Sequence, residues 1–222
     1  EEAPTARSVL KTMTERLSHS TRPNCSQCCD DSAGMGSFND SATSDLRAVQ
    51  PRETASIRVV ADARIDNGKQ LAGILELETG NDAFTERLLI AAYLRWGSDC
   101  ASHLVGDFAF VILDDERNQI FCARDPFGVR PLYYHLSSKV FAFSTEIEAL
   151  VAIPNISNRI NEWRIAELLI DSFIDKDTTY FEAIKRLPDA HTLTITRKSA
   201  EIVRYLSPES VSDQYLPSDR AY

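Results

Sequence analysis

The sequence predicts an α+β fold in which helices lie on antiparallel sheets. Short apolar segments separated by turn residues occur as three adjacent pairs, at 108–123, 132–143 and 192–205, which is typical of β-hairpins. Two other segments, 5–18 and 84–96, have the 3.6-residue periodicity of amphipathic helices. Because hairpins outnumber strand–helix–strand units, we expect an antiparallel sheet rather than a parallel one.

The N-terminal part begins with a helix and continues into a polar stretch. Residues 5–18 gather their apolar side chains on one helical face, formed by Val9, Leu10, Met13 and Leu17. Residues 18–53 are rich in Ser, Asp, Asn, Cys and Gly, so we expect an irregular region with one or two weak strands. The apolar segment 57–61 predicts a strand, and the residues 66–68 have the turn chemistry that closes it.

A second helix is predicted at 84–96. Its apolar face consists of Phe84, Leu88, Leu89, Ala92, Tyr93 and Trp96. Asn81 or Asp82 has the side chain needed to cap its N-terminus. We expect a short helix at 99–105 to follow it.

The periodicity then changes from helix to strand. The uninterrupted apolar segment 108–113 predicts a strand buried on both faces. Residues 114–118 turn the chain, and 119–123 return beside the first strand as a hairpin. A second hairpin is expected to pair 132–135 with 140–143.

Two further helices carry N-terminal signals. Thr145 and Glu148 have the spacing of a capping box, which predicts a helix that begins near Thr145. Asn161 precedes the helical segment 162–173 and is expected to cap it.

The last hairpin, 192–196 with 201–205, closes the predicted domain, which we assign to residues 1–206. The tail 207–222 has four serines and little apolar content, so it is expected to be a linker.

Composition excludes several functional classes. Asp and Glu number 33 against 24 Lys and Arg, so the chain of 222 residues carries a net charge of -9. Such a surface repels phosphate backbones, and we expect no nucleic-acid binding. No apolar run approaches the ~18 residues of a membrane span, and the N-terminal residues lack the basic start and apolar core of a secretory signal.

The cysteines indicate a reducing, cytoplasmic setting. There are five of them, an odd number at low density, which does not fit a disulfide framework. They are Cys25, Cys28, Cys29, Cys100 and Cys122.

A zinc site is the sharpest alternative use of these cysteines. His19, Cys25, Cys28 and Cys29 lie within eleven residues, and C-x2-C is half of a zinc pattern. Cys28 and Cys29 are adjacent and are expected to point apart, and no second C-x2-C occurs, so we expect no metal site. Processing that exposes Cys25 as an N-terminal nucleophile is another alternative, but it removes the first helix.

Three segments are more specific than these patterns. They are Gly106–Phe110, Ala123–Tyr134, which contains Arg-Asp-x-x-Gly-x-x-Pro-Leu-Tyr, and Phe143–Leu150. In this order they resemble the N-terminal glutaminase domain (class II glutamine amidotransferase) of the asparagine synthetase family. The resemblance runs from about residue 57 to 206. The local sequence is most similar to branches that contain lasso-peptide macrolactam synthetases and β-lactam synthetases.

The Arg-Asp segment itself is expected to be structural. Arg124 and Asp125 end a buried strand, where charge must be compensated by pairing or by bonds to local backbone. Gly128 and Pro131 punctuate a fixed turn, and Gly128 is a candidate for a positive φ.

The resemblance implies the N-terminal nucleophile hydrolase fold, an αββα sandwich of antiparallel sheets. The family's nucleophile is an N-terminal cysteine whose own α-amine, titrating near ~8, accepts the proton. This chain begins with Glu1 and has no Gly-Ile strand of the kind that follows that cysteine. We therefore expect the first strand to be missing from this chain, and no catalytic residue within it.

The family's Asn-Gly-Glu segment, an oxyanion and substrate element, corresponds to Asp62, Ala63 and Arg64. Asp62 puts an acceptor where a donor is required, and Ala63 does not take a positive φ as glycine does. Arg64 reverses the charge that meets the substrate's α-ammonium.

Two more substrate positions follow from the resemblance. The arginine for the substrate carboxylate is expected near 34–40, where no arginine occurs. Asp82 matches the family's Gly-Ser-Asp, whose aspartate contacts the substrate amine, although a helix cap is the alternative role for it.

These substitutions indicate a glutaminase-type domain that has lost glutamine hydrolysis and acts structurally within an ATP-dependent, amide-forming enzyme. ATP and Mg²⁺ are expected in a synthetase domain, on the same chain or a separate one, because neither Ser-Gly-Gly-x-Asp-Ser nor a P-loop occurs in these residues. One alternative is an active amidotransferase that supplies ammonia for asparagine synthesis if a cysteine precedes Glu1. The other is a non-enzymatic interaction module, for which a homodimer is one form.

Overall fold

Two long strands form the centre of the larger sheet. β4 (Ile57–Ile65) and β5 (Gly106–Asp114) pair antiparallel over their full length, with Ile57 opposite Asp114 and Ile65 opposite Gly106. The computed structural model describes residues 5–17, 24–30, 32–39, 52–53, 56–79, 84–171 and 177–207. The sheet has the antiparallel order β11-β10-β6-β5-β4-β3. Its other strands are β3 (Arg52–Glu53), β6 (Gln119–Arg124), β10 (His191–Thr196) and β11 (Ala200–Arg204).

A second layer of strands faces this sheet. It contains a three-stranded sheet of order β8-β7-β9 and a separate hairpin of β1 and β2. The strands are β1 (Asn24–Cys29), β2 (Gly34–Asn39), β7 (Tyr133–Leu136), β8 (Phe141–Ser144) and β9 (Lys185–Arg186).

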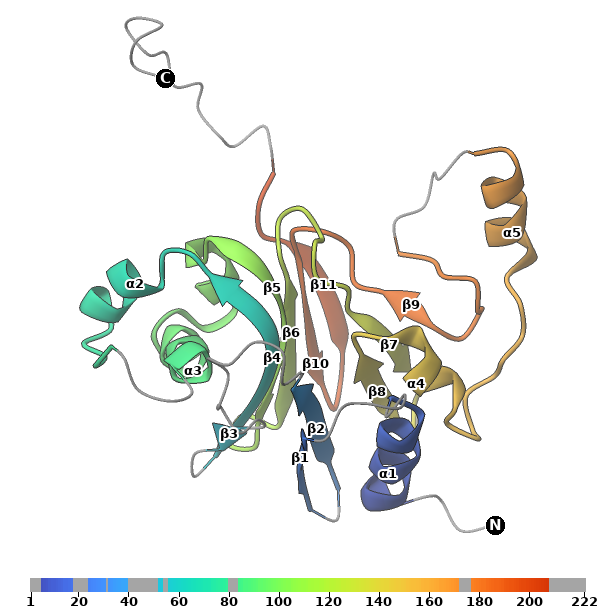
Figure 1. Cartoon of the computed structure of the whole chain (residues 1–222), viewed down its shortest axis with the longest axis horizontal. Helices are drawn as coiled ribbons and strands as arrows, with labels where there is room; N and C mark the ends of the chain where they lie inside the picture. Colours follow the sequence, from blue (N-terminus) through green and yellow to red (C-terminus); the bar gives the residue numbers. More distant parts are fainter. Residues whose placement is uncertain are drawn as a thin grey trace, which may run out of the picture.

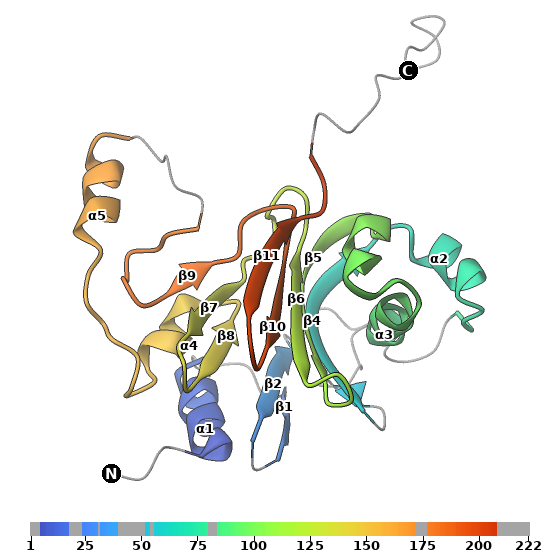
Figure 2. The ribbon, with the colours of Figure 1, turned by 180° about the vertical axis from the view of Figure 1, so that it is seen from behind.

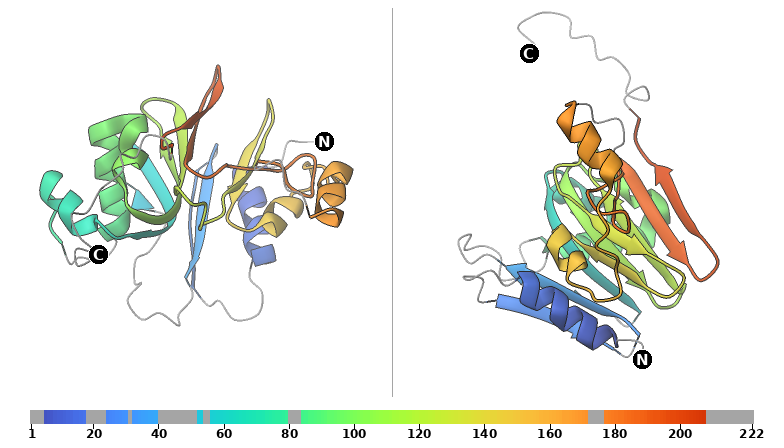
Figure 3. Two further views of the ribbon diagram at one scale, coloured as in Figure 1. Left: turned by 90° about the horizontal axis from the view of Figure 1, so that it is seen from above. Right: turned by 90° about the vertical axis from the view of Figure 1, so that its right-hand side faces the viewer.

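Helices cover both outer faces, so the molecule is a four-layered αββα sandwich, as predicted (Figure 1). Seen from above, the layers run from α2 and α3 through the two sheets to α1 and α4 (Figure 3). The helices are α1 (Ala6–Leu17), α2 (Gly68–Ile74), α3 (Phe84–Trp96), the 3-10 helix η1 (Gly97–His103), α4 (Ile147–Val151) and α5 (Glu162–Leu169).

Three apolar cores hold these four layers together. Val59 and Val60 are neighbours in β4 and point to opposite faces, because side chains alternate along a strand. Val59 packs with Leu88 of α3 in the helix-side core, and Val60 packs with Tyr134 of β7 in the core between the sheets. Leu150 of α4 belongs to the third core, between the small sheet and its helices.

Most elements lie where the sequence predicted them. The three hairpins are present, and α3 has its expected bounds and its expected buried face. Asn161 caps α5, since its side chain accepts a hydrogen bond from the backbone N–H of Arg164 at 3.2 Å. The polar stretch 18–53, where one or two weak strands were expected, contains β1, β2 and the two-residue strand β3.

Four predictions need correction. The strand predicted at 57–61 is β4, and it continues to Ile65, because pairing with β5 holds its polar residues in extended conformation. Helix α2 follows directly where only a turn was expected. Thr145 does not cap α4: Glu146 is the N-cap residue and makes no side-chain cap bond, so the capping-box prediction is wrong. Helix α5 ends at Leu169 instead of residue 173.

Several predicted features fall outside the described residues, among them Asp82, His19 and the tail beyond residue 207. Within the described ranges, no helix has both the length and the apolar character needed to span a membrane.

Candidate functional site

One end of the space between the sheets is lined by polar side chains. Asp62 of β4 lies opposite Ala109 of β5, which in turn lies opposite Arg124 of β6. Residues in one such row share a face, and Ala109 belongs to the core between the sheets. Asp62, Arg64 and Arg124 are therefore on the inner face, at the end where β4 finishes.

Asp62 forms an ion pair across the site. Its Oδ1 lies 3.3 Å from Nη1 of Arg130, in the turn that follows β6, and both side chains are about two-fifths exposed. Burial raises the pKa of the Asp62 carboxyl above its usual value, and the charge of Arg130 lowers it in opposition. The burial effect is the larger one, so the surroundings disfavour a charged Asp62 on balance.

Arg64 is held by two carboxylates. Its Nε lies 3.1 Å from Oδ1 of Asp66, and its Nη2 lies 3.1 Å from Oδ2 of Asp107, the residue opposite it on β5. The guanidinium is solvent-exposed, so these pairs contribute little to stability, but they set its direction and neutralise its charge.

Ala63 lies between these two residues and points the other way. Its side chain packs against the helix-side core, and its backbone has the extended conformation of β4. The segment predicted to lack the substrate arginine, 34–40, includes β2 (Gly34–Asn39). Asp82 belongs to the residues that the structure does not describe, so its two predicted roles stay predictions.

Arg124 ties the turn after β6 to a distant segment. Its three guanidinium nitrogens each donate to a main-chain carbonyl: Nε to Arg130 at 2.8 Å, Nη2 to Gly128 at 2.6 Å and Nη1 to Leu187 at 2.7 Å. Its own carbonyl accepts from the hydroxyl of Tyr205 at 2.7 Å. Three carbonyl oxygens thus compensate a guanidinium that is almost fully buried.

Asp125 organises the same turn from the other side. Its carboxylate is fully buried and accepts backbone N–H bonds from Phe127, Val129 and Arg130, at 3.1, 2.9 and 2.9 Å. Gly128 has the expected positive φ of 64°. Pro131 follows directly. The four motif residues therefore build a rigid turn, and this turn presents Arg130 to Asp62.

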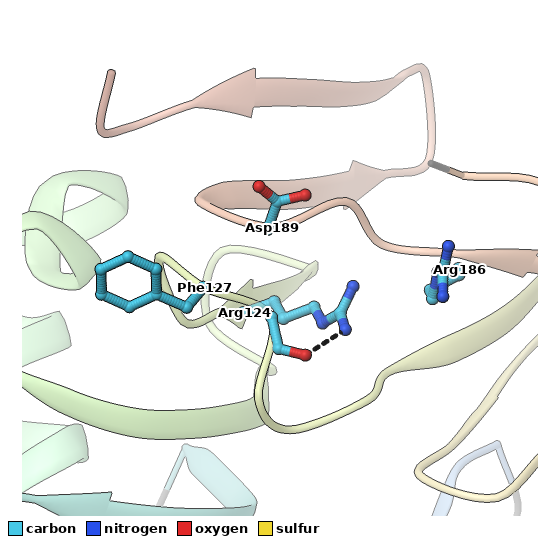
Figure 4. Close-up of a pocket in the computed structure, with 5 residues that line it drawn as sticks. Arg124, Phe127, Arg186 and Asp189 are labelled. Atoms are coloured by element: carbon cyan, nitrogen blue, oxygen red, sulfur yellow. Dashed lines mark hydrogen bonds between the residues drawn. The ribbon is translucent and has the colours of Figure 1, made fainter. Parts of the chain in front are cut away.

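A cavity of about 250 Å³ opens beside this turn (Figure 4). Its lining residues are Arg124, Phe127, Gly128, Arg186 and Asp189. The guanidinium of Arg124 is occupied by the carbonyls of the turn, and Phe127 extends to solvent with 88% of its surface exposed. Three of the five lining residues thus belong to the turn motif, and Arg186 of β9 and Asp189 come from a different segment.

The cysteine cluster does not form a metal centre within the described part of the chain, where no group of three His, Cys, Asp or Glu side chains comes together. Cys28 packs against the core between the sheets, whereas the Sγ of Cys29 lies near Gly34, on the α1 side. The two neighbours point apart, as alternation along β1 requires. His19 and the side chain of Cys25 lie outside the described residues.

Three members of the site were not predicted from the sequence. They are Arg130 of the turn motif, Asp107 of the motif Gly106–Phe110 and Asp66 of the turn after β4. The register of β4 with β5 identifies Asp107 as the partner of Arg64, but a sequence pattern does not fix that register. Arg130 meets Asp62 only because the turn folds back over the sheet.

Comparison with known proteins identifies the family to which this domain belongs. The sequence matches the glutamine amidotransferase domain family over residues 2–206. This chain belongs to that family.

Asparagine synthetases are among the relatives of this glutamine amidotransferase domain. It is 36% identical to glutamine-hydrolyzing asparagine synthetase 3 of Bacillus subtilis over 124 residues, which cover 55% of this chain and 20% of the relative. It is 29% identical to a putative glutamine-hydrolyzing asparagine synthetase 2 of Methanocaldococcus jannaschii over 155 residues, covering 69% of this chain and 30% of the relative. The chain thus spans less than a third of these relatives, and the predicted relationship to the asparagine synthetase family is confirmed.

The fold is also shared with a solved amidotransferase. Glutamine phosphoribosylpyrophosphate amidotransferase from Bacillus subtilis superposes with a TM-score of 0.54 at 17% identity, over 79% of this chain and 36% of that chain. This likeness supports the N-terminal nucleophile hydrolase fold.

Proposed function

We propose that this glutamine amidotransferase domain has lost glutamine hydrolysis and serves as a structural part of an ATP-dependent, amide-forming enzyme of the asparagine synthetase type. The proposal rests on the ion pairs made by Asp62 and Arg64, the residues that correspond to the family's substrate element. Asp62 is engaged by Arg130, and Arg64 is engaged by Asp66 and Asp107.

Hydrolysis of a side-chain amide needs hydrogen-bond donors at the developing oxyanion. An ionised Asp62 offers only acceptors and adds a negative charge, which raises the energy of that oxyanion. The guanidinium of Arg64 has no acceptor for an α-ammonium group, and its two carboxylate partners leave it poorly suited to hold the α-carboxylate of an amino acid. Ala63 has the extended backbone conformation of β4. The chain therefore does not form, at this position, the turn that a glycine with a positive φ would allow.

The length of the relatives supports the rest of the proposed enzyme. They are several times longer than the matched region, which fits an additional synthetase domain that uses ATP and Mg²⁺ in the cytoplasm, with 207–222 as the linker toward it. The intact mass of the protein from its natural source tests this part. A mass tens of kDa above the 24.8 kDa of this chain supports a synthetase on the same polypeptide.

Glutamate formation from L-glutamine tests the loss of hydrolysis, with Bacillus subtilis asparagine synthetase 3 as the positive control. We expect no glutamate above the buffer rate from the natural protein. Steady glutamate release at a rate near that of the control would overturn the proposal.

A binding experiment tests the site independently of any nucleophile. We expect no heat of binding for millimolar L-glutamine in calorimetry of this chain. The variant D62N/A63G/R64E restores the donor, the glycine and the carboxylate of the family element, and it is expected to gain measurable binding. Equal binding by both proteins would show that the three substitutions do not block the site.

A further inference from the structure

The cavity of about 250 Å³ beside the turn after β6 has charged groups of both signs in its wall. Arg124 and Arg186 contribute two guanidinium groups, and Asp189 contributes one carboxylate. The side chain of Arg124 extends from the turn toward Arg186, and Asp189 lies on the segment that follows β9 (Figure 4). The wall thus combines two cations and one anion around a single small space.

Arg124 is the buried member of this group, with a relative exposure of 6%. Each of its three guanidinium nitrogens donates to one main-chain carbonyl, and both Nη atoms carry a second N–H. These carbonyl acceptors are neutral, so they solvate the charge without cancelling it. A buried guanidinium in this state is suited to hold an anion, because hydrogen bonds to a charged acceptor are the stronger ones.

The electrostatic surroundings of Arg124 also favour an anion. Burial lowers the pKa of its guanidinium, and the charge of Arg186 lowers it further. The negative charges of Asp125 and Asp189 act in the opposite direction without outweighing these effects. The carboxylate of Asp125 is held in the turn by the three backbone N–H groups that donate to it. A further anion beside the two arginines is therefore stabilised by both positive charges.

The size of the cavity limits the class of ligand. Pockets for drug-sized ligands have volumes of roughly 300–1,000 Å³, so this cavity suits a smaller molecule, of the size of an amino acid rather than a nucleotide. Phe127, in the same turn, is 88% exposed and offers its ring as an apolar surface beside the charged groups. Gly128 adds no side chain, and a Cβ there would lie 2.8 Å from Nη2 of Arg124.

We propose that this cavity binds a small α-amino acid with an apolar side chain. The α-carboxylate accepts hydrogen bonds from Arg124 and Arg186. The α-ammonium group pairs with Asp189, and the side chain packs on Phe127. The lining does not include Asp62 or Arg64, so occupation of this site does not depend on glutamine hydrolysis.

Other charged ligands match the wall less well. A phosphate ester or another dianion meets the carboxylate of Asp189, which repels it. An amine without a carboxylate meets the guanidinium groups of Arg124 and Arg186, which repel it in turn. A zwitterion carries one charge of each sign on a single carbon atom and places both beside groups of opposite sign. The mixed wall therefore selects for an amino acid and against these two classes.

Equilibrium dialysis with radiolabelled L-leucine tests the site in the protein at its natural length. We expect saturable binding, and R186Q is expected to weaken it about tenfold. R197Q is the matched control, because it removes the same charge from the exposed turn between β10 and β11. Binding that is absent in the wild type, or equal in the wild type and R186Q, would overturn the proposal.

Two further variants separate loss of binding from loss of folding. Because Phe127 is exposed, F127A is not expected to shift the unfolding midpoint. It is expected to lower the affinity for L-leucine several-fold and to leave that for L-alanine unchanged, since alanine has no side chain to pack on the ring. D189N is expected to weaken binding about tenfold, with the exposed change E116Q as its control. Wild-type affinity for L-leucine in both F127A and D189N would contradict the proposal.

Three ligands that each lack one feature of L-leucine test how it is recognised. Isocaproate lacks the α-ammonium group, isoamylamine lacks the α-carboxylate, and L-glutamine has a polar side chain in place of the apolar one. Each is expected to bind about tenfold more weakly than L-leucine. Isocaproate that binds as tightly as L-leucine would indicate a simple anion site, and L-glutamine that does so would indicate no preference for an apolar side chain. Either result contradicts the proposal.

Discussion

The guanidinium of Arg130 lies 3.3 Å from the carboxylate of Asp62, although the two residues are 68 positions apart in the chain. Asp62 comes from a central strand of the larger sheet, and Arg130 comes from the rigid turn that Asp125 organises. The contact therefore joins the turn motif to the position that the resemblance predicts for the family's substrate element. The turn and this predicted element are parts of one arrangement.

Asp62 is expected to titrate above the ordinary value of 3.8, because burial outweighs the attraction of Arg130. Between the unfolded and the folded pKa, the folded state holds a proton that the unfolded state has lost. This group therefore contributes its full stability below pH 3.8, and the contribution is lost as the pH rises through the folded pKa. Carboxyl-carbon NMR titration measures this pKa directly.

The variant R130Q separates the two causes. It removes the lowering charge, so the pKa of Asp62 is expected to rise further. The variant D62N removes the titration, and its stability relative to wild type is expected to improve as the pH rises above 4. An Asp62 pKa below 3.8 in the wild type would contradict the balance assigned here.

Gly128→Ala is expected to destabilise the fold by about 1–3 kcal/mol. Gly128 has φ 64°, and a Cβ at this position would lie 2.8 Å from Nη2 of Arg124, whose guanidinium is held by three carbonyls. Urea unfolding measures the loss. Gly73→Ala is the matched control, because nothing lies within 4 Å of its added Cβ within helix α2, and it is expected to stabilise by about 0.5–1 kcal/mol. Similar effects of the two substitutions would argue against strain at Gly128.

Asp125→Ala is expected to lower the free energy of unfolding by about 3–5 kcal/mol, because it leaves three backbone N–H groups around a buried position without their acceptor. Asp125→Asn keeps part of the acceptor capacity and is expected to cost less. Differential scanning calorimetry compares both with Glu116→Ala, an exposed change in the β5–β6 turn that is expected to be neutral. If Asp125→Ala unfolded at the wild-type temperature, the turn would not depend on this carboxylate.

The cysteine thiols are expected to differ in their reactivity toward a disulfide reagent. Burial raises the pKa of Cys100 to about 12 and raises that of Cys122 as well, so neither forms a thiolate at mildly alkaline pH. Cys29 is only half-buried and is expected to react. Labelling with an aromatic disulfide reagent, read by peptide mass spectrometry, measures this order. Labelling of Cys122 before unfolding would mean that the core between the sheets opens readily.

Local chemistry was enough to predict most of the elements. The face of α3, the Asn161 cap and the three hairpins each depend on residues within a few positions of one another, and each is where the pattern indicated it. The capping box at Thr145 failed because the approach of the chain from β8 puts Glu146 at the cap position. Strand β4 was predicted too short because its last residues are polar, and only their pairing with β5 keeps them extended.

By itself the sequence determined the fold family, through three segments that resemble the glutaminase domain of the asparagine synthetase family. It also determined which residue types stand at the positions that this resemblance predicts for the substrate element. Only the tertiary structure decided what those residues touch across the fold, because Asp107 reaches Arg64 through strand register and Arg130 reaches Asp62 through a folded turn. Similarly, the periodicity of α5 showed a helix, but its direction relative to the rest of the domain depends on the anchoring of Asn161 and Arg164. Contacts between distant segments set both results, and a linear pattern does not record such contacts.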